Sequence, residues 1–497
     1  MTAKPTLSRR SSGVLLHPTS LPGARGGALG AEALAFVDFL ADCGQSWWQM
    51  LPVCPPDEIG SPYASPSSFA GSPALIDTDL LCVEGLLKKA ELGQSKPKAL
   101  RAAFSHFGRR GTREDKEDFE AFRARESWWL DDHSLFMALK HAYHGRPWTE
   151  WDERLRRRDP ARLDEARANE AEEVRFQDFA QWLFSRQWLA VRRHAAARGV
   201  GLMGDAPIYV RHDSADCWAN QDLFFLNGSG APEVVAGVPP DYFSADGQLW
   251  GNPLYRWERH QATGFSWWVS RLKACAERFD ALRLDHFIGF RNYWEIPAGE
   301  TTAIKGRWVD APGDELFETV RRELKGLEIV AEDLGVATPA VLALRDKFGF
   351  PGMRLAQFSF GGEEKDWPEN WPENCVGYTG THDNDTTRGW WEDDGTANAM
   401  RSPAQAEKER RAFRRAVGRE PELPSWDMLK LVWRSPARTA IAPMTDLVNA
   451  GGESRMNRPG TTAANWRWRM EPGLLTARLA GRLALLTGAC GRAPESE

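Results

Sequence analysis

Short apolar runs that end abruptly in polar, glycine or proline residues recur along the chain. Eight of them lie at 13–20, 47–53, 201–207, 281–287, 328–335, 352–358, 376–384 and 439–447. Near-continuous apolar runs of this length are typical of parallel strands buried on both faces. Helical patterns lie between most of them, for example at 265–277, 314–324 and 339–347. The order predicts an α/β fold, a (β/α)8 TIM barrel, although a doubly wound sheet would give the same local signals.

Two gaps between the predicted strands are too long for ordinary connections. The first, approximately 54–188, holds a Pro/Ser-rich segment and then a highly charged helical region. We interpret it as an inserted helical subdomain after the second strand. The second gap, approximately 209–264, follows the third strand, and its stretch 237–257 is rich in aromatic, Gly and Pro residues without helical periodicity. We expect a long loop region that forms a lid or a binding wall there, within a single barrel domain over 1–497.

Charge and composition narrow the possible partners. The chain has 63 Lys and Arg against 69 Asp and Glu, a net charge of −6, and 42% hydrophobic residues. This balance can bury a large core and argues against nucleic acid as the main partner. Tryptophan is unusually frequent, with 23 residues. Its flat apolar ring suits stacking on a ligand as well as packing in a large core.

The sequence also bears on where the protein works. The apolar run Val14–Leu16 is far too short for a signal peptide, and no stretch approaches the length of a membrane span. The longest candidate, 474–490, is interrupted by Arg478 and Arg482 and predicts an amphipathic closing helix. The seven cysteines are scattered and form no C-x-x-C pair. They predict reduced thiols in a cytoplasmic protein without structural zinc.

Ionisable residues end three of the predicted strands. They are Arg283, Asp285 and His286 in RLDH, Glu332 and Asp333 in AEDLG, and His382 and Asp383 in THDN. Arg283 shares a strand face with Asp285 by the two-residue period, so its cation would keep that carboxylate ionised. Active sites of such barrels lie at the C-terminal strand ends. We therefore expect the three sets of carboxyl groups to face one opening.

Several kinds of chemistry compete for these residues. An Asp after a strand often caps the next helix, but capping needs no histidine. Asp, Glu and His together can bind a divalent ion, although no compact ligand spacing such as H-E-x-x-H is present. Nucleotide, dinucleotide and serine-hydrolase motifs are also lacking. Carboxyl groups beside aromatic loops fit retaining glycosidic chemistry, where one carboxylate attacks and a second carboxyl serves as general acid and base.

Longer motifs run through the chain. They are SSGVLLHPTSLPG (11–23), SPYASPSSFAG (61–71), GDAPIYV (204–210), VVAGVPPDYFSADGQLWGNPLYRW (234–257), RLDHFIGFRNYWEIPA (283–298), VAEDLGVATP (330–339), YTGTHDNDTTRGWW (378–391) and RMNRPGTTAANWRWR (455–469). Through them the sequence resembles the amylomaltases, or 4-α-glucanotransferases, of glycoside hydrolase family 77, which are related to the α-amylases. The resemblance implies transfer of an α-1,4-glucan segment from a maltooligosaccharide or starch chain to the 4-hydroxyl of glucose or another glucan. It implies no cofactor and no catalytic metal.

Carried over by position, the resemblance also implies roles for individual residues. Asp285 would be the nucleophile, Glu332 the general acid and base, and Asp383 the group that stabilises the distorted sugar. The implied substrate-binding residues are Tyr63, Asp205, Asp241, Trp250, Arg283, His286, Phe358, His382 and Asn457. An α-amylase-type α-1,4-glucan hydrolase on the same fold is the nearest alternative, since both reactions share the first step. A glucan-binding protein without activity is a remote one.

Overall fold

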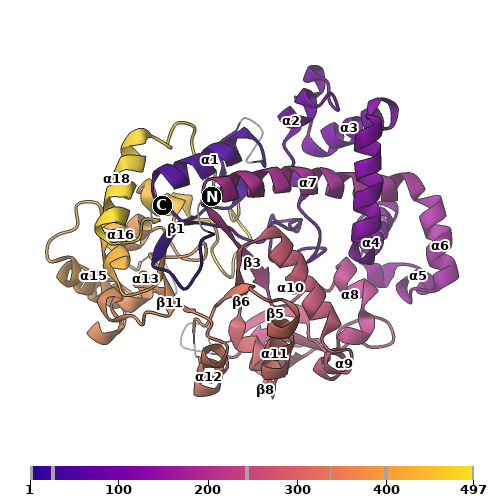
Figure 1. Ribbon diagram of the computed structural model, residues 1–497. Helices are drawn as coiled ribbons and strands as arrows, with labels where there is room; N and C mark the ends of the chain where they lie inside the picture. Colours follow the sequence, from indigo (N-terminus) through magenta and orange to yellow (C-terminus); the bar gives the residue numbers. More distant parts are fainter. Residues whose placement is uncertain (1–3, 24–27, 241–245, 336, 397–400, 495–497) are drawn as a thin grey trace.

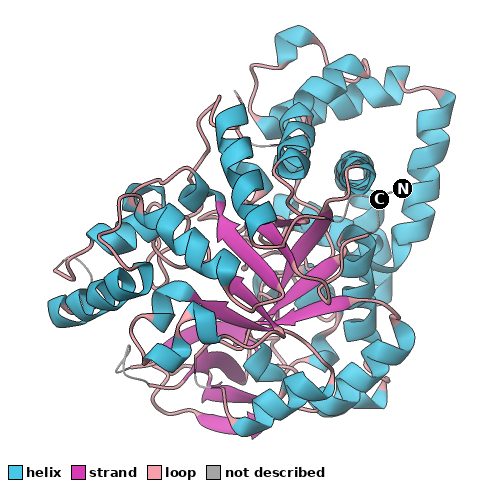
Figure 2. Ribbon diagram, turned by 60° about the vertical axis from the view of Figure 1, so that its left-hand side comes forward, coloured by secondary structure: helices cyan, strands magenta, loops and turns pink. Residues whose placement is uncertain are grey.

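Eight parallel strands close into a barrel at the centre of the computed structural model, which describes residues 4–23, 28–240, 246–335, 337–396 and 401–494 (Figure 2). Around the barrel the order is β1-β12-β11-β10-β9-β6-β3-β2. The strands are β1 (Ser11–Leu15), β2 (Trp47–Gln49), β3 (Gly201–Pro207), β6 (Ala281–Asp285), β9 (Glu328–Ala331), β10 (Gly352–Leu355), β11 (Cys375–Tyr378) and β12 (Thr439–Pro443). Each predicted strand contains or overlaps one of them. The predicted (β/α)8 barrel is confirmed, and the doubly wound sheet is excluded.

Helices surround the barrel (Figure 2). They are α1 (Ala31–Asp42), α10 (Ser266–Arg278), α11 (Gly313–Glu323), α12 (Pro339–Lys347), α13 (Ala356–Ser359), α14 (Thr387–Glu392), α15 (Pro403–Val417), α16 (Pro424–Arg434), α17 (Met444–Leu447) and α18 (Ala477–Ala489). The predicted helices at 265–277, 314–324 and 339–347 are α10, α11 and α12, and α18 is the predicted closing helix. No helix in the described parts of the chain is long and apolar enough to cross a bilayer.

A helical extension separates β2 from β3 and projects from one side of the barrel (Figure 1). It contains α2 (Thr78–Val83), α3 (Lys96–Arg110), α4 (Arg113–Ala142), α5 (Glu153–Arg156), α6 (Pro160–Asn169) and α7 (Ala171–Ala197). Helix α4 begins where the Thr112 hydroxyl accepts the Asp115 N–H. Helix α7 packs along α4 and also along α1, so it connects the extension with the barrel. Residue 188, the boundary we predicted, falls inside α7.

The region between β3 and α10 is more regular than the sequence suggested. Besides α8 (Ala215–Ala219) and α9 (Trp257–Ala262), it holds β4 (Val234–Val238) and β5 (Gln248–Pro253). These strands join β7 (Asn292–Pro297) and β8 (Arg307–Asp310) in an antiparallel sheet of order β5-β4-β7-β8. The prediction of an irregular 237–257 loop was therefore partly wrong. The partner strand β7 comes after β6 in the chain, and local periodicity does not reveal such a distant pairing.

Side chains that point into the barrel change from apolar to ionisable along β3 and β6. Met203 on β3 and Ala281 on β6 belong to an interior apolar cluster and pair with each other across the two strands. Two residues further, on the same faces, Asp205 lies opposite Arg283, and Asp285 ends β6. The two-residue period thus places apolar side chains in the middle of the barrel and charged side chains at the C-terminal ends of these strands. This is the end where barrel enzymes have their active sites.

A buried arginine, Arg492, connects the C-terminal segment to the barrel through hydrogen bonds. The Arg492 side chain is fully buried and donates hydrogen bonds to five backbone carbonyl oxygens. The acceptors are the carbonyls of Ser11, Trp433, Ser435, Ala437 and Arg438, which surround the starts of β1 and β12. Burial, together with neighbouring Arg10, lowers the pKa of Arg492 to about 9.

Replacing this arginine tests how much its hydrogen bonds stabilise the folded protein. We expect Arg492→Ala to lower the free energy of unfolding by about 3 kcal/mol, because several buried carbonyls lose a charged donor together. Urea unfolding followed by circular dichroism measures the change. Arg478→Ala, on the exposed side of α18, is the control. Equal stability of the two variants would contradict this account of the C-terminus.

Candidate active site

A buried arginine links two aspartates at the C-terminal end of the barrel. Arg283 Nη1 donates to both carboxylate oxygens of Asp205, at 2.9 and 2.8 Å, and its Nη2 lies 2.8 Å from Oδ1 of Asp285. Burial opposes the charge on Arg283, but the carboxylates of Asp205 and Asp285 raise its pKa well above its usual value. The Arg283–Asp285 contact predicted from the strand period is therefore present. It places a positive charge against the Asp285 carboxylate.

Glu332 lies next to Asp285, directly after β9. Its Oε2 accepts the backbone N–H of His286 at 2.7 Å, and its Oε1 accepts that of Leu334 at 3.0 Å. Burial raises the pKa of Glu332 to about 7; the Asp285 carboxylate adds to the rise, whereas Arg283 opposes it. A carboxyl with such a pKa exchanges protons readily near neutral pH. The two neighbouring groups thus have different environments, one paired with a guanidinium and one desolvated.

Asp383 follows β11 and is held from two sides. Its Oδ1 accepts a hydrogen bond from Nδ2 of Asn457 at 2.6 Å, and its Oδ2 lies 3.3 Å from Nε2 of His382. The Asn457 N–H in turn donates to the His382 carbonyl at 3.0 Å. The Asp383 side chain remains 42% exposed, so its oxygens can reach a ligand. Asn457 comes from a distant loop, and no local pattern connects it with Asp383.

Tyr63 contacts both Asp205 and His382 and so connects two parts of the site. Its hydroxyl donates to Oδ2 of Asp205 at 2.6 Å, and its ring stacks on the His382 ring with centroids 5.2 Å apart. Burial raises the pKa of this phenol well above its usual value, and the Asp205 carboxylate adds to the rise. Asp285 and Asp383 are also near enough to act on it electrostatically. The C-terminal ends of β3 and β6 and the segment after β11 therefore meet around Tyr63.

His286 forms the other side of the site with Trp250. The Trp250 ring meets the His286 ring edge to face, with centroids 4.8 Å apart, and it exposes 37% of its surface. Burial lowers the pKa of His286 to about 4, so the imidazole is neutral at neutral pH and can both donate and accept hydrogen bonds. His286 has a left-handed backbone with φ of 51°, a conformation that is costly for a non-glycine residue. Such strain is often found at functional sites.

Two predicted site residues are not joined to this cluster. Phe358, on α13 after β10, exposes 61% of its surface, and no ring of the described residues stacks on it. Asp241 lies outside the described residues. Their substrate contacts remain predictions.

The structure adds three side chains that the sequence reasoning did not single out. The Trp466 ring lies 5.8 Å from Tyr63 and 6.0 Å from His382, measured between centroids. Arg455 donates to the backbone carbonyls of Asp383 and Asn457. Tyr209 lies beside Trp250 and His286. All three belong to motifs quoted above, but nothing in the local pattern distinguishes them from core residues.

The arrangement has the groups that a retaining glycosidic reaction requires. One carboxylate is paired with a guanidinium, a second carboxyl with a raised pKa lies next to it, and aromatic rings line the surroundings. Within the described residues, no group of three or more His, Cys, Asp or Glu side chains is arranged to hold a metal ion.

Comparison with known proteins agrees with this geometry. A family model described as 4-alpha-glucanotransferase, for glycoside hydrolase family 77, matches residues 16–476. The chain belongs to this family. It is 46% identical to a 4-alpha-glucanotransferase of Thermus thermophilus, over 97% of this chain and 99% of that one. It is 41% identical to a chloroplastic/amyloplastic 4-alpha-glucanotransferase of Arabidopsis thaliana, over 93% of this chain and 82% of that one.

A solved structure of an amylomaltase also matches this 4-alpha-glucanotransferase family member in fold. An amylomaltase from Streptococcus agalactiae, solved in complex with acarbose, superposes with a TM-score of 0.91 at 36% identity. The match covers 98% of this chain and 100% of that one. The resemblance drawn from the motifs is thus confirmed, as are the enzyme class and the fold that it implied.

Proposed function

We propose that this enzyme transfers α-1,4-glucan segments by two successive displacements at the sugar C1, with Asp285 as nucleophile and Glu332 as acid and base. The observation that carries the proposal is the pair itself: Glu332 accepts the N–H of His286, the residue next to Asp285, while Arg283 binds Asp285. Donors would be maltooligosaccharides or starch chains. Acceptors would be glucose or other glucans.

In the first displacement, the Asp285 carboxylate attacks C1 of the donor from the face opposite the bond to be broken. Protonated Glu332 gives its proton to the glycosidic oxygen as the C1–O bond breaks, and the leaving chain departs with a free 4-hydroxyl. The product is a glycosyl ester on Asp285. Asp383, with its exposed oxygens, would accept hydrogen bonds from hydroxyls of the distorted ring and strengthen them at the transition state.

In the second displacement, the 4-hydroxyl of an acceptor glucan replaces the departed chain. Ionised Glu332 removes its proton, the new C1–O bond forms, and the ester bond to Asp285 breaks. The configuration at C1 is retained after two inversions. Tyr63 would act as a positioning residue, because its hydroxyl binds Asp205, and Asp205 binds the same arginine as Asp285.

The raised pKa of Glu332 leads to a pH dependence. The first displacement needs the protonated acid, whose pKa is about 7 in the free enzyme. We therefore expect kcat/KM to fall above about pH 7, approaching a tenfold loss per pH unit. Initial rates of glucose release from maltotriose between pH 5 and 9 measure this. A profile that stays flat up to pH 9 would contradict the assignment of Glu332 as the acid.

Trp250 offers a test of how acceptor glucan competes with water. Its half-exposed ring next to His286 would stack on an acceptor sugar and leave less room for water. Trp250→Ala is expected to raise the ratio of hydrolysis to transfer roughly three- to tenfold, as the loss of one stacking contact allows. Trp250→Phe keeps a ring and should restore most of the transfer. Equal ratios in all three proteins would remove Trp250 from the acceptor site.

Product analysis separates transfer from the alternative reactions. Purified enzyme is incubated with maltotriose, and the products are resolved by chain length over time. Transfer predicts glucose together with maltopentaose and longer chains, with little net gain of reducing ends. Shortening to glucose and maltose alone would indicate an α-amylase-type hydrolase, and an unchanged substrate would indicate a binding protein.

We further propose that the enzyme works in the cytoplasm and that one barrel domain carries both insertions, at approximately 54–188 and 209–264. The buried thiols of Cys43, Cys217 and Cys375 form no disulfide, which supports a reducing compartment. Packing of α7 against both α4 and α1 supports treating the helical insertion as part of one domain.

A further inference from the structure

A buried carboxylate, Asp446, lies beside the segment that carries Asp383. It belongs to the short helix α17, which directly follows β12. Strand β12 pairs with β11 in the barrel, so Asp446 lies next to the C-terminal end of β11, where the segment 380–386 begins. Only 1% of the Asp446 surface is exposed. The residue is therefore shielded from substrate, and any effect on the reaction must pass through its neighbours.

Hydrogen bonds join Asp446 to both ends of the segment 380–386. Its Oδ2 accepts a hydrogen bond from the hydroxyl of Thr379, directly after β11, at 2.5 Å. At the other end, where α14 begins, Thr387 donates its backbone N–H to Oδ1 and its hydroxyl to Oδ2, each at 2.7 Å. Both threonines are fully buried. Because water cannot replace these donors, the carboxylate fixes the two ends of the segment relative to each other.

The surroundings of Asp446 favour a role that depends on geometry. All three of its donors are uncharged groups. Burial raises the pKa of Asp446, and the hydrogen bonds from Thr379 and Thr387 oppose this rise. A carboxylate is costly to bury beside neutral donors. It suits this place because its two oxygens can accept several hydrogen bonds at once.

The segment held in this way contains Asp383. Within it, Oδ1 of Asn384 accepts the N–H and the hydroxyl of Thr381, at 2.8 and 2.9 Å, and so closes a tight turn around Asp383. These bonds fix the shape of the turn. The bonds to Asp446 fix where the turn lies on the barrel, and with it the half-exposed Asp383 carboxylate.

We propose that Asp446 is a positioning residue of the transfer reaction, which holds both ends of the segment 380–386 and thereby keeps the Asp383 carboxylate beside the distorted sugar ring. The inference rests on the function proposed above for Asp383. Asp446 acts through the positions of its oxygens and not through its charge. An asparagine can therefore replace it, since the amide oxygen accepts the Thr387 N–H and the NH2 group donates to the two threonine hydroxyls.

The kcat for maltotriose in three variants tests this role. Asp446→Ala should lower kcat about a hundredfold, the effect of a displacement of about 1 Å at a catalytic group. Asp446→Asn should recover most of this loss and come within about threefold of the parent. Thr379→Val removes one hydrogen bond at nearly constant side-chain size, and it should lower kcat about tenfold. This last variant takes the place of Asp446→Ala if the alanine variant does not fold.

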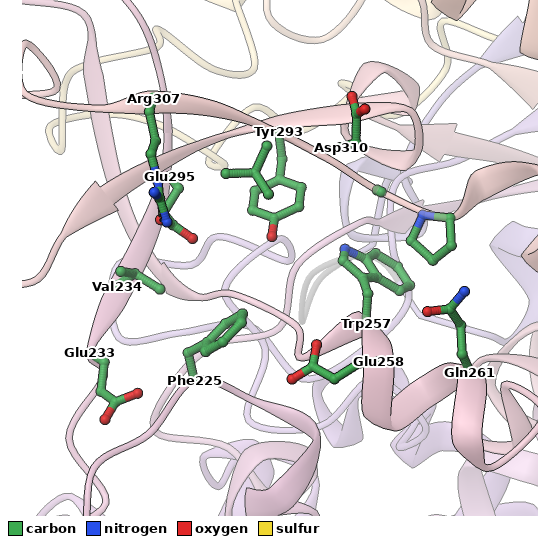
Figure 3. A pocket seen from close by; sticks show the side chains of 13 residues that line it. Phe225, Glu233, Val234, Trp257, Glu258, Gln261, Tyr293, Glu295, Arg307 and Asp310 are labelled. Atoms are coloured by element: carbon green, nitrogen blue, oxygen red, sulfur yellow. Dashed lines mark hydrogen bonds and ion pairs between the residues drawn. The ribbon is translucent and has the colours of Figure 1, made fainter.

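Glu295 is the matched control for the loss of a buried carboxylate. It is 7% exposed, accepts a hydrogen bond from Arg307 at 2.7 Å, and lines a pocket beside the antiparallel sheet with Phe225 and Tyr293 (Figure 3). Glu295→Ala should lower the unfolding temperature and leave kcat unchanged. If its kcat fell as far as that of Asp446→Ala, the loss would follow from destabilisation in general, and the proposal would be overturned.

A double-mutant cycle with Asp383 distinguishes positioning from an independent effect. Asp383→Ala removes the group that is positioned, so adding Asp446→Ala should lower kcat by no more than about threefold further. Two losses that multiply would overturn the proposal, as would full activity of Asp446→Ala or a hundredfold loss in Asp446→Asn. If Asp383→Ala alone kept the rate of the parent, the function proposed for Asp383 would fail, and this inference with it.

Discussion

Asp285→Asn is expected to lower kcat/KM for disproportionation of maltotriose by about 10⁴-fold or more. An amide cannot form the glycosyl ester, so the double displacement has no first step. The fold should persist, because Arg283 keeps both of its hydrogen bonds to Asp205 and the Asp285 side chain is 28% exposed. Glucose release measured by a coupled assay gives the rate, and thermal unfolding confirms that the variant is folded.

A matched control lies at the other end of the same strand. Asp280 immediately precedes β6, and its carboxylate accepts the N–H of Leu202. Asp280→Asn makes the same chemical change at the end of the barrel that stabilises the fold, so it should affect unfolding more than rate. If Asp285→Asn retained a rate close to that of Asp280→Asn, another group would have to be the nucleophile.

Glu332→Gln is expected to give the second large effect, about 10²- to 10⁴-fold on maltotriose. Glutamine cannot protonate the departing sugar oxygen or deprotonate the acceptor. A substrate with a good leaving group separates these two roles. With α-maltotriosyl fluoride, ester formation should proceed in Glu332→Gln without acid assistance, and breakdown of the ester should become the slow step. A burst of fluoride followed by slow turnover is the signature of this change.

Glu328→Gln serves as its control, since Glu328 begins β9 and accepts the N–H of Leu7 at the opposite end of the barrel. No fluoride burst is expected from it. The contrary result is that neither variant gives a fluoride burst and that Glu332→Gln loses as much rate on the fluoride as on maltotriose. Glu332 would then act in some way other than as acid and base.

The barrel could be predicted from the sequence because its strands are buried on both faces. Runs such as ALRLD on β6 and TAIAP on β12 are mostly apolar and buried, and ALRLD ends on the site residue Asp285. The ends of these apolar runs also predicted the positions of Asp285, Glu332 and Asp383, because each run ends at or near the C-terminal end of a barrel strand. The Arg283–Asp285 pair followed from the two-residue period alone.

Other features depend on contacts between distant residues and leave little local trace. Asn457 bonds Asp383 across 74 positions, and the Tyr63 hydroxyl reaches Asp205 across 142. The β4–β7 pairing joins two strands separated by a barrel strand, so a stretch such as 237–257 looks irregular by itself. The roles of Tyr63 and Asn457 came only from resemblance to family motifs. For Phe358 the structure gives no contact that fixes a role.

Trapping the covalent intermediate tests the central claim most directly. Glu332→Gln enzyme is mixed with α-maltotriosyl fluoride, quenched in acid, digested with pepsin and examined by mass spectrometry. The account predicts one peptide heavier by the mass of a maltotriosyl group, with fragmentation placing that mass on Asp285. A sugar found on any other carboxylate, or complete turnover of the fluoride with no labelled peptide, would contradict it.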